Sequence, residues 1–502
     1  MKKLYRYSTI VFSVLSLSLT SCSDYLDRDD DDNITEADVF ARYEKVNGLV
    51  SDVYAAAKKA DRPLVFFEHF SNSAITDECE GTNVEGNITN NFNNGAWNPN
   101  SLPGSVGQYW EALYEGIRKA NLIIENVEKY NTPDNPQQDG DLRNRIGEMY
   151  FMRGYFHMLL MRMYGEAPYI DYVVHAGDNM DFKKESVHAM VEKIVADAQT
   201  AYSMVPNKYV KTSENFGRVD KGACLGLIAF VRWVAATPLW NGASQYGYNL
   251  HRVFENEYAY DINRWRRAKE AAKAVMDFEV GGTKRYSLYT KHDANDFKDP
   301  ADGNLNDSRV YARLWDMFYD MDAFANEYVF FMTKSKDQAW QGDIYPPSRE
   351  GSSRQQPVQE QVDEYEYIVG DYGYPVYSAE ARKGGYDDAN PYVKGTRDPR
   401  FYRDIIYHGA PYRNNNNESK IINTASGSDK IGATNATTTG YYLRKFQQES
   451  WNKSGNFSIN APAIWRLPEF IYIYAEACNE LGEDIDEAYK QVNIVRERSF
   501  MK

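Results

Sequence analysis

The chain has 502 residues and a formal net charge of −15, and it contains 40 tyrosines. An acidic protein of this kind is not expected to bind nucleic acid, because neutralisation of phosphates by basic residues dominates that interaction. The length is sufficient for a large hydrophobic core or for two lobes. Four cysteines are too few for a disulfide framework, and no pair of them has the spacing of a zinc site.

The first 22 residues have the pattern of a bacterial lipoprotein export signal. A short basic region precedes an apolar run from Ile10 to Leu19, which is too short to span a bilayer but suits a secretory signal. Small residues then precede Cys22, as in a lipobox, where the thiol receives a diacylglycerol and the chain is cut. We therefore expect residues 1–21 to be a signal peptide and Cys22 to carry the lipid that anchors the mature protein to a membrane surface.

The mature chain is expected to begin with a tether and to continue into helices. Residues 22–33 are rich in aspartate, as solvated tethers are, and loss of the signal peptide takes the formal charge to −18. Apolar residues recur at spacings of three and four over much of 34–280, which indicates an N-terminal helical region with a loop-rich interruption at about 61–107. The predicted helices cover about 37–53, 108–130, 142–164, 186–204, 219–235 and 264–278.

The second part of the chain, 281–502, has a weaker helical pattern. Tyr, Asn, Asp, Gly and Pro dominate it as far as about residue 460, which predicts a loop-rich lobe in which Asn414–Asn417 and Thr424–Thr439 are mobile. Two helices are expected to close it, Pro468–Leu481 and Ile485–Arg498, with small residues where they approach each other. The expected fold is mainly α, with tetratricopeptide-like helical pairs that support an irregular, loop-rich lobe.

Neither a cofactor nor a catalytic or metal site is expected. Acidic residues cluster around Cys79, but they lack the spacing of an EF-hand. The histidines never fall into a metalloprotease pattern, and His157 is expected to be a structural histidine within a helix. No nucleophile elbow or phosphate-binding loop is present. A pair of carboxylates for glycoside hydrolysis is not singled out among 72 acidic residues, so a surface hydrolase remains an open alternative.

Aromatic residues in loops are the candidate ligand-binding residues. A sugar ring has apolar C–H faces on which Trp or Tyr can stack, while neighbouring polar side chains bind its hydroxyl groups. The candidates are Trp97, Asn98, Trp340, Tyr345, Tyr372 and Tyr374. Peptides would use a surface of the same character. Tryptophans at helical spacing are instead expected in the core, namely Trp110, Trp233, Trp265 and Trp465.

Several stretches behind the lipobox together resemble the SusD/RagB family of outer-membrane nutrient-uptake lipoproteins. No single motif is decisive, and the resemblance rests on their order along most of the mature chain. The stretches include Trp110-x-x-x-Tyr114, Arg145 to Pro168, Gly217 to Ala223, Thr237 to Asn241, Asn326-Glu327, Asp398-Pro399-Arg400 and Tyr474-Ala475-Glu476-Ala477.

The resemblance implies the helical fold described above and a role in nutrient uptake at the cell surface. It implies binding of a nutrient and its delivery to a SusC-type TonB-dependent outer-membrane barrel. The loop aromatics make an oligosaccharide, captured without catalysis, the expected ligand. The runner-up is peptide capture by the same architecture, and a surface hydrolase comes third. Family members usually continue past a helix like the one that ends at Arg498, whereas this chain stops at Lys502, so by this comparison it is either a naturally short member or a truncated sequence.

Overall fold

The structure is a computed structural model that describes part of the chain. The described residues are 35–60, 70–81, 88–96, 98, 100, 104–130, 136–209, 214–246, 254–291, 314, 316–332, 342–393, 395–413, 419–447 and 463–501. The signal peptide, Cys22, the tether, Trp97, Trp340 and Asn414–Asn417 lie outside these ranges. The expectations for those residues therefore stay predictions.

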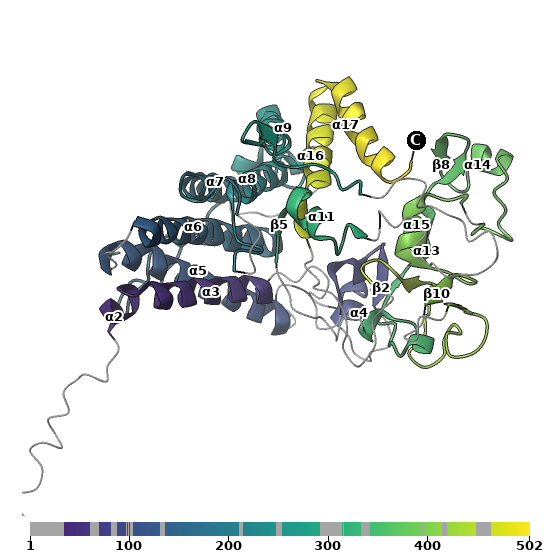
Figure 1. Ribbon diagram of the computed structural model, residues 1–502, viewed down its shortest axis with the longest axis horizontal. Coiled ribbons are helices and arrows are strands. Elements are labelled where there is room, and N and C mark those ends of the chain that lie inside the picture. Colours follow the sequence, from purple (N-terminus) through teal and green to yellow (C-terminus); the bar gives the residue numbers. More distant parts are fainter. Residues whose placement is uncertain are drawn as a thin grey trace, which may run out of the picture.

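Long amphipathic helices form a helical lobe from the first half of the chain (Figure 1). Helices that follow one another pack side by side, from α5 on α6 through α8 on α9, while α3 lies on α5 and α6. This arrangement buries the apolar stripes of α3, α5 and α7, which confirms the periodicity seen in the sequence, whereas α6 lies between its neighbours and is buried on all sides from Phe151 to Met161. The helices are α2 (Glu36–Phe40), α3 (Tyr43–Ala60), α5 (Gly104–Tyr130), α6 (Pro136–Tyr164), α7 (Val187–Met204), α8 (Lys221–Ala236) and α9 (Ile262–Met276).

Local sequence sets where these helices begin and end. Ser186 and Asp220 stand just before α7 and α8, and each side chain accepts a hydrogen bond from a backbone N–H of the first turn. Such caps typically contribute about 1 kcal/mol each. Beyond the end of α6, Gly165 has φ of 73°, and a Cβ there would lie 2.9 Å from the ring of Trp240. Glycine is therefore required at this helix end.

The last two helices belong in space to the helical lobe. The closing pair is α16 (Leu467–Leu481) and α17 (Ile485–Arg498), and the turn between them contains Gly482 with φ of 66°. Besides its contact with α17, α16 packs extensively on α9 (Figure 1). The C-terminal pair thus extends the stack of helices, although the loop-rich segment precedes it in the sequence.

The second lobe is built from short elements joined by loops. Its strand pairs are all antiparallel, and β2 (Cys79–Gly81) joins β1 (Ile75–Thr76) to β6 (Gln355–Pro357). This sheet fixes the early segment 70–81 on the second lobe. The other pairs of this lobe are β7 (Tyr367–Val369) with β8 (Tyr372–Tyr374), β9 (Ile405–Ile406) with β12 (Tyr442–Leu443), and β10 (Pro411–Arg413) with β11 (Ser419–Ile421). The pair of β5 (Tyr328–Phe331) with β13 (Ala463–Arg466) contributes to the helical core, and β3 (Glu279–Val280) with β4 (Thr283–Lys284) directly follows α9. The short helices are α4 (Ile88–Asn93), α11 (Met321–Asn326), α13 (Gln359–Asp363), α14 (Ala379–Lys383) and α15 (Pro399–Asp404).

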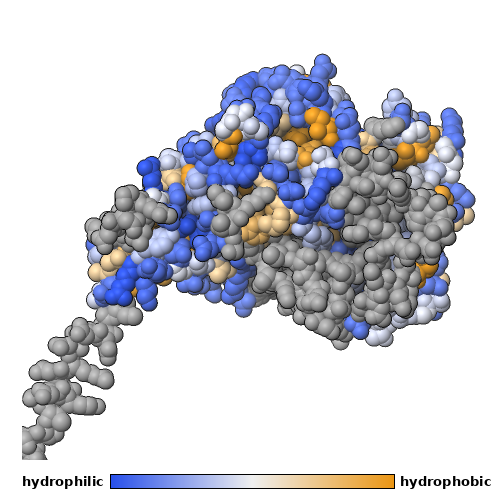
Figure 2. All heavy atoms as spheres, viewed as in Figure 1, coloured by the Kyte–Doolittle hydropathy of each residue, from blue (hydrophilic) through white to orange (hydrophobic). Residues whose placement is uncertain are grey.

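Each lobe has its own hydrophobic core, and the two cores differ in composition. Aliphatic and methionine side chains dominate the helical core, whereas tyrosine and phenylalanine dominate the core of the second lobe. Buried tyrosines there also anchor loops, since the hydroxyl of Tyr442 donates to the carbonyl of Asp429 at 2.8 Å. Tyrosine thus supplies apolar area and a hydrogen bond where regular structure is scarce. On the face in Figure 2, hydrophilic side chains cover most of the visible helical lobe.

The tract Thr424–Thr439 differs from the expectation of mobility. Thr437 is fully buried, and Gln356 of β6 accepts hydrogen bonds from the hydroxyl of Thr437 at 3.1 Å and from the backbone N–H of Thr438 at 2.7 Å. A buried amide side chain requires such partners. The expectation was wrong because its polar composition resembled a solvated loop, while the tract in fact supplies the hydrogen bonds of a buried glutamine.

A buried carboxylate joins the second lobe to the C-terminal helices. Glu327 is fully buried, and it accepts hydrogen bonds from Arg466 at 3.0 Å, from Arg498 at 2.8 Å and from the backbone N–H of Tyr289 at 2.6 Å. Paired charges of this kind are tolerated inside a protein only when their hydrogen bonds are satisfied. This explains why the sequence places an acid at the start of β5.

Histidine and cysteine residues behave as the sequence indicated. His157 is fully buried, where its Nδ1 donates to the carbonyl of Arg153 at 2.8 Å and its Nε2 accepts from the N–H of Ile170 at 3.0 Å. It is a structural histidine, as predicted. Cys79, Cys224 and Cys478 are buried free thiols. Within the described ranges, the helices are all too short or too polar to span a bilayer.

Candidate ligand-binding site

A pocket of about 330 Å³ lies where the early segment 70–81 meets the second lobe. Four separate stretches of chain converge on it, held together by the pairing of β2 with β6 and of β9 with β12. The residues that line it are Ser71, Ser73, Glu78, Cys79, Gln355, Pro357, Gln361, Tyr365, Asp404, Ile405, Leu443, Lys445 and Phe446. The pocket depends on contacts between residues that are hundreds of positions apart in the sequence.

Asp404 is a fixed negative charge at the wall of this pocket. The guanidinium of Arg403 contacts both of its carboxylate oxygens, and the hydroxyl of Tyr365 donates to it at 2.9 Å. Burial by itself raises the pKa of Asp404, but the charges of Arg403 and Lys445 and the hydrogen bonds more than offset this and lower it. Asp404 is therefore ionised at neutral pH and can accept hydrogen bonds.

Lys445 and Cys79 complete the chemistry of the wall. Burial lowers the pKa of Lys445, and Asp404 partly offsets that effect. Burial raises the pKa of the Cys79 thiol to about 12, so this cysteine is protonated at neutral pH and is not an activated nucleophile. An ionised acceptor and a lysine thus face the same space as an inert thiol.

The pocket combines hydrogen-bonding groups with apolar surface. Glu78, Gln361 and the serine hydroxyls can donate to or accept from a polyhydroxylated ligand, while Pro357, Leu443 and Phe446 offer surface to its C–H groups. A glycosidase would need a carboxyl group with a raised pKa to act as general acid, and the pKa of Asp404 is lowered instead. Across the described residues, no three or more His, Cys, Asp or Glu side chains are grouped as metal ligands would be. The geometry suits binding.

Of the predicted ligand contacts, the four that the structure describes, Asn98, Tyr345, Tyr372 and Tyr374, do not line this pocket. Tyr372 is 68% exposed at the tip of the β7–β8 hairpin, and its ring lies 6.5 Å from that of Tyr374, which is half-buried. Asn98 is exposed, and its side chain accepts from the N–H of Asn100 at 2.9 Å. Asn98 and the two hairpin tyrosines are available on the surface, but the structure does not bring them together into one site.

Tyr345 is a correction to the sequence-based prediction. It is only 1% exposed, and its ring packs edge-on against that of Tyr412 with 5.9 Å between ring centroids. It therefore belongs to the core of the second lobe and has no free face for a ligand. The prediction was wrong because an irregular segment has no periodicity that separates buried rings from exposed ones.

The tryptophans at helical spacing fall into two groups. Trp265 and Trp465 are buried, as predicted. Trp110 and Trp233 are only half-buried, and the indole N–H of Trp233 donates to Glu476 at 2.7 Å. Trp110 lines a separate, apolar hollow of about 490 Å³ between α5 and the segment after α6, together with Tyr114 and other apolar residues. The periodicity correctly placed Trp110 on the inner face of α5, but it could not show that neighbouring segments leave part of this face exposed.

Comparison with known protein families matches both parts of the chain. A family model described as "Starch-binding associating with outer membrane" matches residues 24–231, and a model described as "SusD family" matches residues 320–502. A curated relative, SusD-like protein P2 from Formosa agariphila, is 26% identical over 202 residues. That match spans 39% of this chain and 38% of the relative's length.

Solved structures share the fold over nearly the whole chain. A SusD-like protein from Bacteroides fragilis superposes with a TM-score of 0.70 at 19% identity, over 93% of this chain and 80% of the other. A SusD-like carbohydrate-binding protein from the same species gives a TM-score of 0.67 at 15% identity, over 92% and 79%. A SusD homologue from Bacteroides thetaiotaomicron gives 0.60 at 18% identity, over 93% and 79%. With its mainly α fold and both family models matched in order, the chain belongs to the SusD/RagB family.

Proposed function

We propose that the protein is a cell-surface lipoprotein that captures an oligosaccharide and delivers it, uncleaved, to a SusC-type TonB-dependent outer-membrane transporter. The observation that carries this proposal is the pocket between segment 70–81 and the second lobe, where fixed polar groups stand beside apolar surface. Family membership supports the same role, since the matching family model is described as starch-binding and associated with the outer membrane.

The N-terminal segment would provide the membrane anchor. Lipid on Cys22, followed by the acidic tether of residues 22–33, would hold the folded body close to the membrane while leaving it free to move. Such a tether suits a protein that must collect a ligand and then meet a transporter. The SusC-type barrel is proposed as the partner because the family resemblance implies it.

The charge state of Asp404 argues against its acting as the general acid of a hydrolase. Of the pocket's two carboxylates, Asp404 is held ionised by Arg403, so it cannot donate a proton to a leaving group at neutral pH. Capture of peptides is the competing function, because a lysine and carboxylates would also bind peptide groups. A binding panel of neutral oligosaccharides and of peptides distinguishes the two.

The experiment is titration calorimetry on the full mature protein with that panel, using paired variants at neighbouring positions. Glu78→Gln changes a residue that lines the pocket, whereas Asp77→Asn makes the same chemical change next to it, outside the pocket. We expect one class of glycan to bind, with a loss of about tenfold for Glu78→Gln, from one charge-assisted hydrogen bond, and no loss for Asp77→Asn. Equal affinity of the three proteins would place the ligand elsewhere.

The loop aromatics remain part of the proposal as a second contact region. Trp97, Trp340, Tyr372 and Tyr374 would stack on sugar rings that extend beyond the pocket, and Asn98 would bind hydroxyl groups. Replacing Trp97 or Trp340 by Ala removes roughly 1–2 kcal/mol of aromatic contact, which is about a tenfold loss of affinity. If both variants bind the glycan like the parent, those rings lie outside the path of the ligand.

A further inference from the structure

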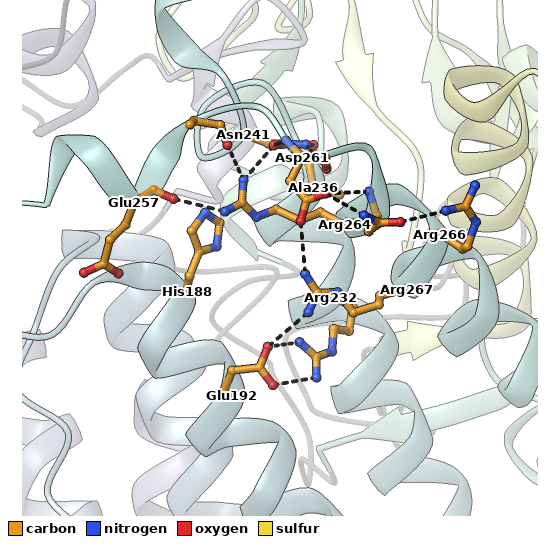
Figure 3. A network of polar contacts seen from close by, with 12 residues as sticks. His188, Glu192, Arg232, Ala236, Asn241, Glu257, Asp261, Arg264, Arg266 and Arg267 are labelled. Atoms are coloured by element: carbon orange, nitrogen blue, oxygen red, sulfur yellow. Dashed lines mark hydrogen bonds and ion pairs between the residues drawn. The ribbon is translucent and has the colours of Figure 1, made fainter.

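A second pocket, unrelated to the one above, lies in the helical lobe where α7, α8 and α9 meet. It has a volume of about 220 Å³, and its polar lining consists of His188 and Glu192 from α7, Arg232 from α8, and Arg264 and Arg267 from α9 (Figure 3). Three guanidinium groups and one carboxylate line it, and Asp261 lies 3.6 Å from Arg267, so the group has an excess of one positive charge if the histidine is neutral. The chain as a whole has a net charge of −15, so this pocket is a positively charged site on an acidic protein.

The three arginines differ in how closely a carboxylate pairs with their positive charge. Arg232 holds Glu192 with both of its terminal nitrogens, one of them at 2.8 Å. Among the described residues, Arg264 donates hydrogen bonds to neutral acceptors only. These are the side chain of Asn241 at 2.8 Å, the carbonyl of Ala259 at 2.6 Å and the carbonyl of Glu257 at 3.0 Å. Its positive charge is therefore not cancelled by a carboxylate in direct contact. The pKa of Arg264 is lowered by burial first, an effect that the charge of Asp261 partly offsets and that the charge of Arg267 reinforces.

Arg267 is the open member of the group. Its nearest carboxylates are Glu192 at 3.7 Å and Asp261 at 3.6 Å, both beyond hydrogen-bonding distance (Figure 3). Its guanidinium makes no hydrogen bond to the residues that the structure describes. A planar fork of N–H donors with no hydrogen-bonded acceptor, beside the guanidinium of Arg264, can recognise a further carboxylate through two parallel hydrogen bonds, although Glu192 and Asp261 already form looser ion pairs with Arg267.

His188 reports the same positive field. Its Nε2 lies 2.8 Å from the carbonyl of Trp240, to which it donates in the neutral state. Burial, followed by the charge of Arg264, lowers the pKa of His188 to about 4, so it is neutral at pH 7 and adds no charge of its own.

The opposite face of α9 shows what an ordinary ion-pair network looks like in this protein. There Arg266 and Lys269 face Glu483 and Asp484, two cations with two anions, at distances of 2.8–3.2 Å. Those charges balance, and their donors are used within the fold. The excess of positive charge on the α7 face therefore does not follow from α9 being basic, and it requires another explanation.

We propose that this pocket binds a carboxylate carried by a small molecule, with Arg267 and Arg264 as the binding groups and Glu192 as a resident carboxylate that limits affinity. The ligand chemistry is shared by two sources, an acidic sugar such as a uronic acid and the side chain of an acidic amino acid. The pocket is independent of the oligosaccharide pocket in residues and in lobe.

Titration calorimetry on the mature protein tests the proposal with glucuronate and with N-acetylglutamate amide, against glucose and N-acetylglutamine amide as neutral counterparts. At least one acid should bind while its neutral counterpart does not, and which acid binds identifies the source. Arg267→Gln should weaken binding at least tenfold. The matched control is Arg266→Gln, the adjacent arginine of the same helix, since the two side chains are 44% and 45% exposed. It should leave affinity unchanged.

A third variant tests whether Glu192 competes with the ligand for the arginines. Glu192→Gln removes the resident carboxylate and frees Arg232, so the acid should bind several-fold more tightly. Thermal melts confirm that each variant is folded, and binding of neutral glycans should be unchanged in all three. No binding of either acid at millimolar concentration overturns the proposal. So does an equal loss in Arg266→Gln and Arg267→Gln, or a Glu192→Gln protein that binds no more tightly than the parent.

Discussion

The buried imidazole of His157 makes the stability of the helical lobe depend on pH. Inside the protein, burial and the charges of Arg153 and Lys193 lower its pKa from 6.5 to about 3. The unfolded chain therefore binds this proton more readily than the folded protein between those two values. The contribution of a neutral His157 to stability is fully present above about pH 6.5 and is lost progressively as the pH falls towards 3.

The magnitude follows from the width of that window. Each pH unit below 6.5 costs about 1.4 kcal/mol, so a shift from pH 7 to pH 4.5 should remove about 2–3 kcal/mol from the free energy of unfolding. The test compares the parent with His157→Phe by urea denaturation at both pH values. At pH 7 the variant should be less stable by about 1–3 kcal/mol, because the buried N–H of Ile170 loses its acceptor. At pH 4.5 this difference should shrink to zero or reverse.

A matched control keeps the comparison specific. His175 has a side chain that is 64% exposed, so His175→Phe should change the free energy of unfolding at pH 7 far less than His157→Phe does. If the difference between the parent and His157→Phe is the same at pH 7 and at pH 4.5, His157 does not titrate within the acid window and the reasoning is refuted.

Three further predictions concern the lobe junction, the surface and the membrane anchor. Glu327→Gln should lower the free energy of unfolding by about 3 kcal/mol or more, because it leaves the charges of Arg466 and Arg498 without their partner; urea denaturation at pH 7 measures this, and a loss below about 1 kcal/mol would contradict it. Tyr372→Ala should change that free energy by less than about 0.5 kcal/mol, since the ring is exposed, and a larger loss would show that the ring has a packing role. Cys22→Ala should leave the protein uncleaved or released from the outer-membrane fraction, and continued labelling with fatty acid would disprove the anchor.

The sequence predicted the helical lobe well, for a physical reason. Helices such as α5 and α7 bury one stripe against neighbours, and that burial repeats every three or four residues, so it can be read from the chain alone. The centre of α6, in contrast, is buried on all sides from Phe151 to Met161. The observed bounds of α7, Val187–Met204, and of α17, Ile485–Arg498, lie within one residue of the prediction. His157 could likewise be assigned a structural role, because it stands on a helix face that is otherwise core.

The candidate site was beyond what local pattern can show. Glu78, Asp404 and Lys445 meet only because β2 pairs with β6 and β9 with β12, and no periodicity records such long-range pairing. The sequence did mark the acidic surroundings of Cys79, but gave no signal for Asp404 or Lys445. Tyr345 was misassigned for the related reason that a ring in a loop is as often buried as displayed. The arginine cluster of α8 and α9 was missed because it forms only where α7, α8 and α9 pack together, and no local spacing records that packing.

The central claim is that the protein captures an oligosaccharide without altering it, and one measurement tests it most directly. The mature protein is incubated with the glycan that binds in titration calorimetry, the complex is isolated, and the bound sugar is released and analysed by chromatography and mass spectrometry. We predict that the glycan is recovered intact and in stoichiometric amount. Recovery of shortened products would show that the protein is a hydrolase, and retention of peptides only, with no glycan, would show that the captured nutrient belongs to another class.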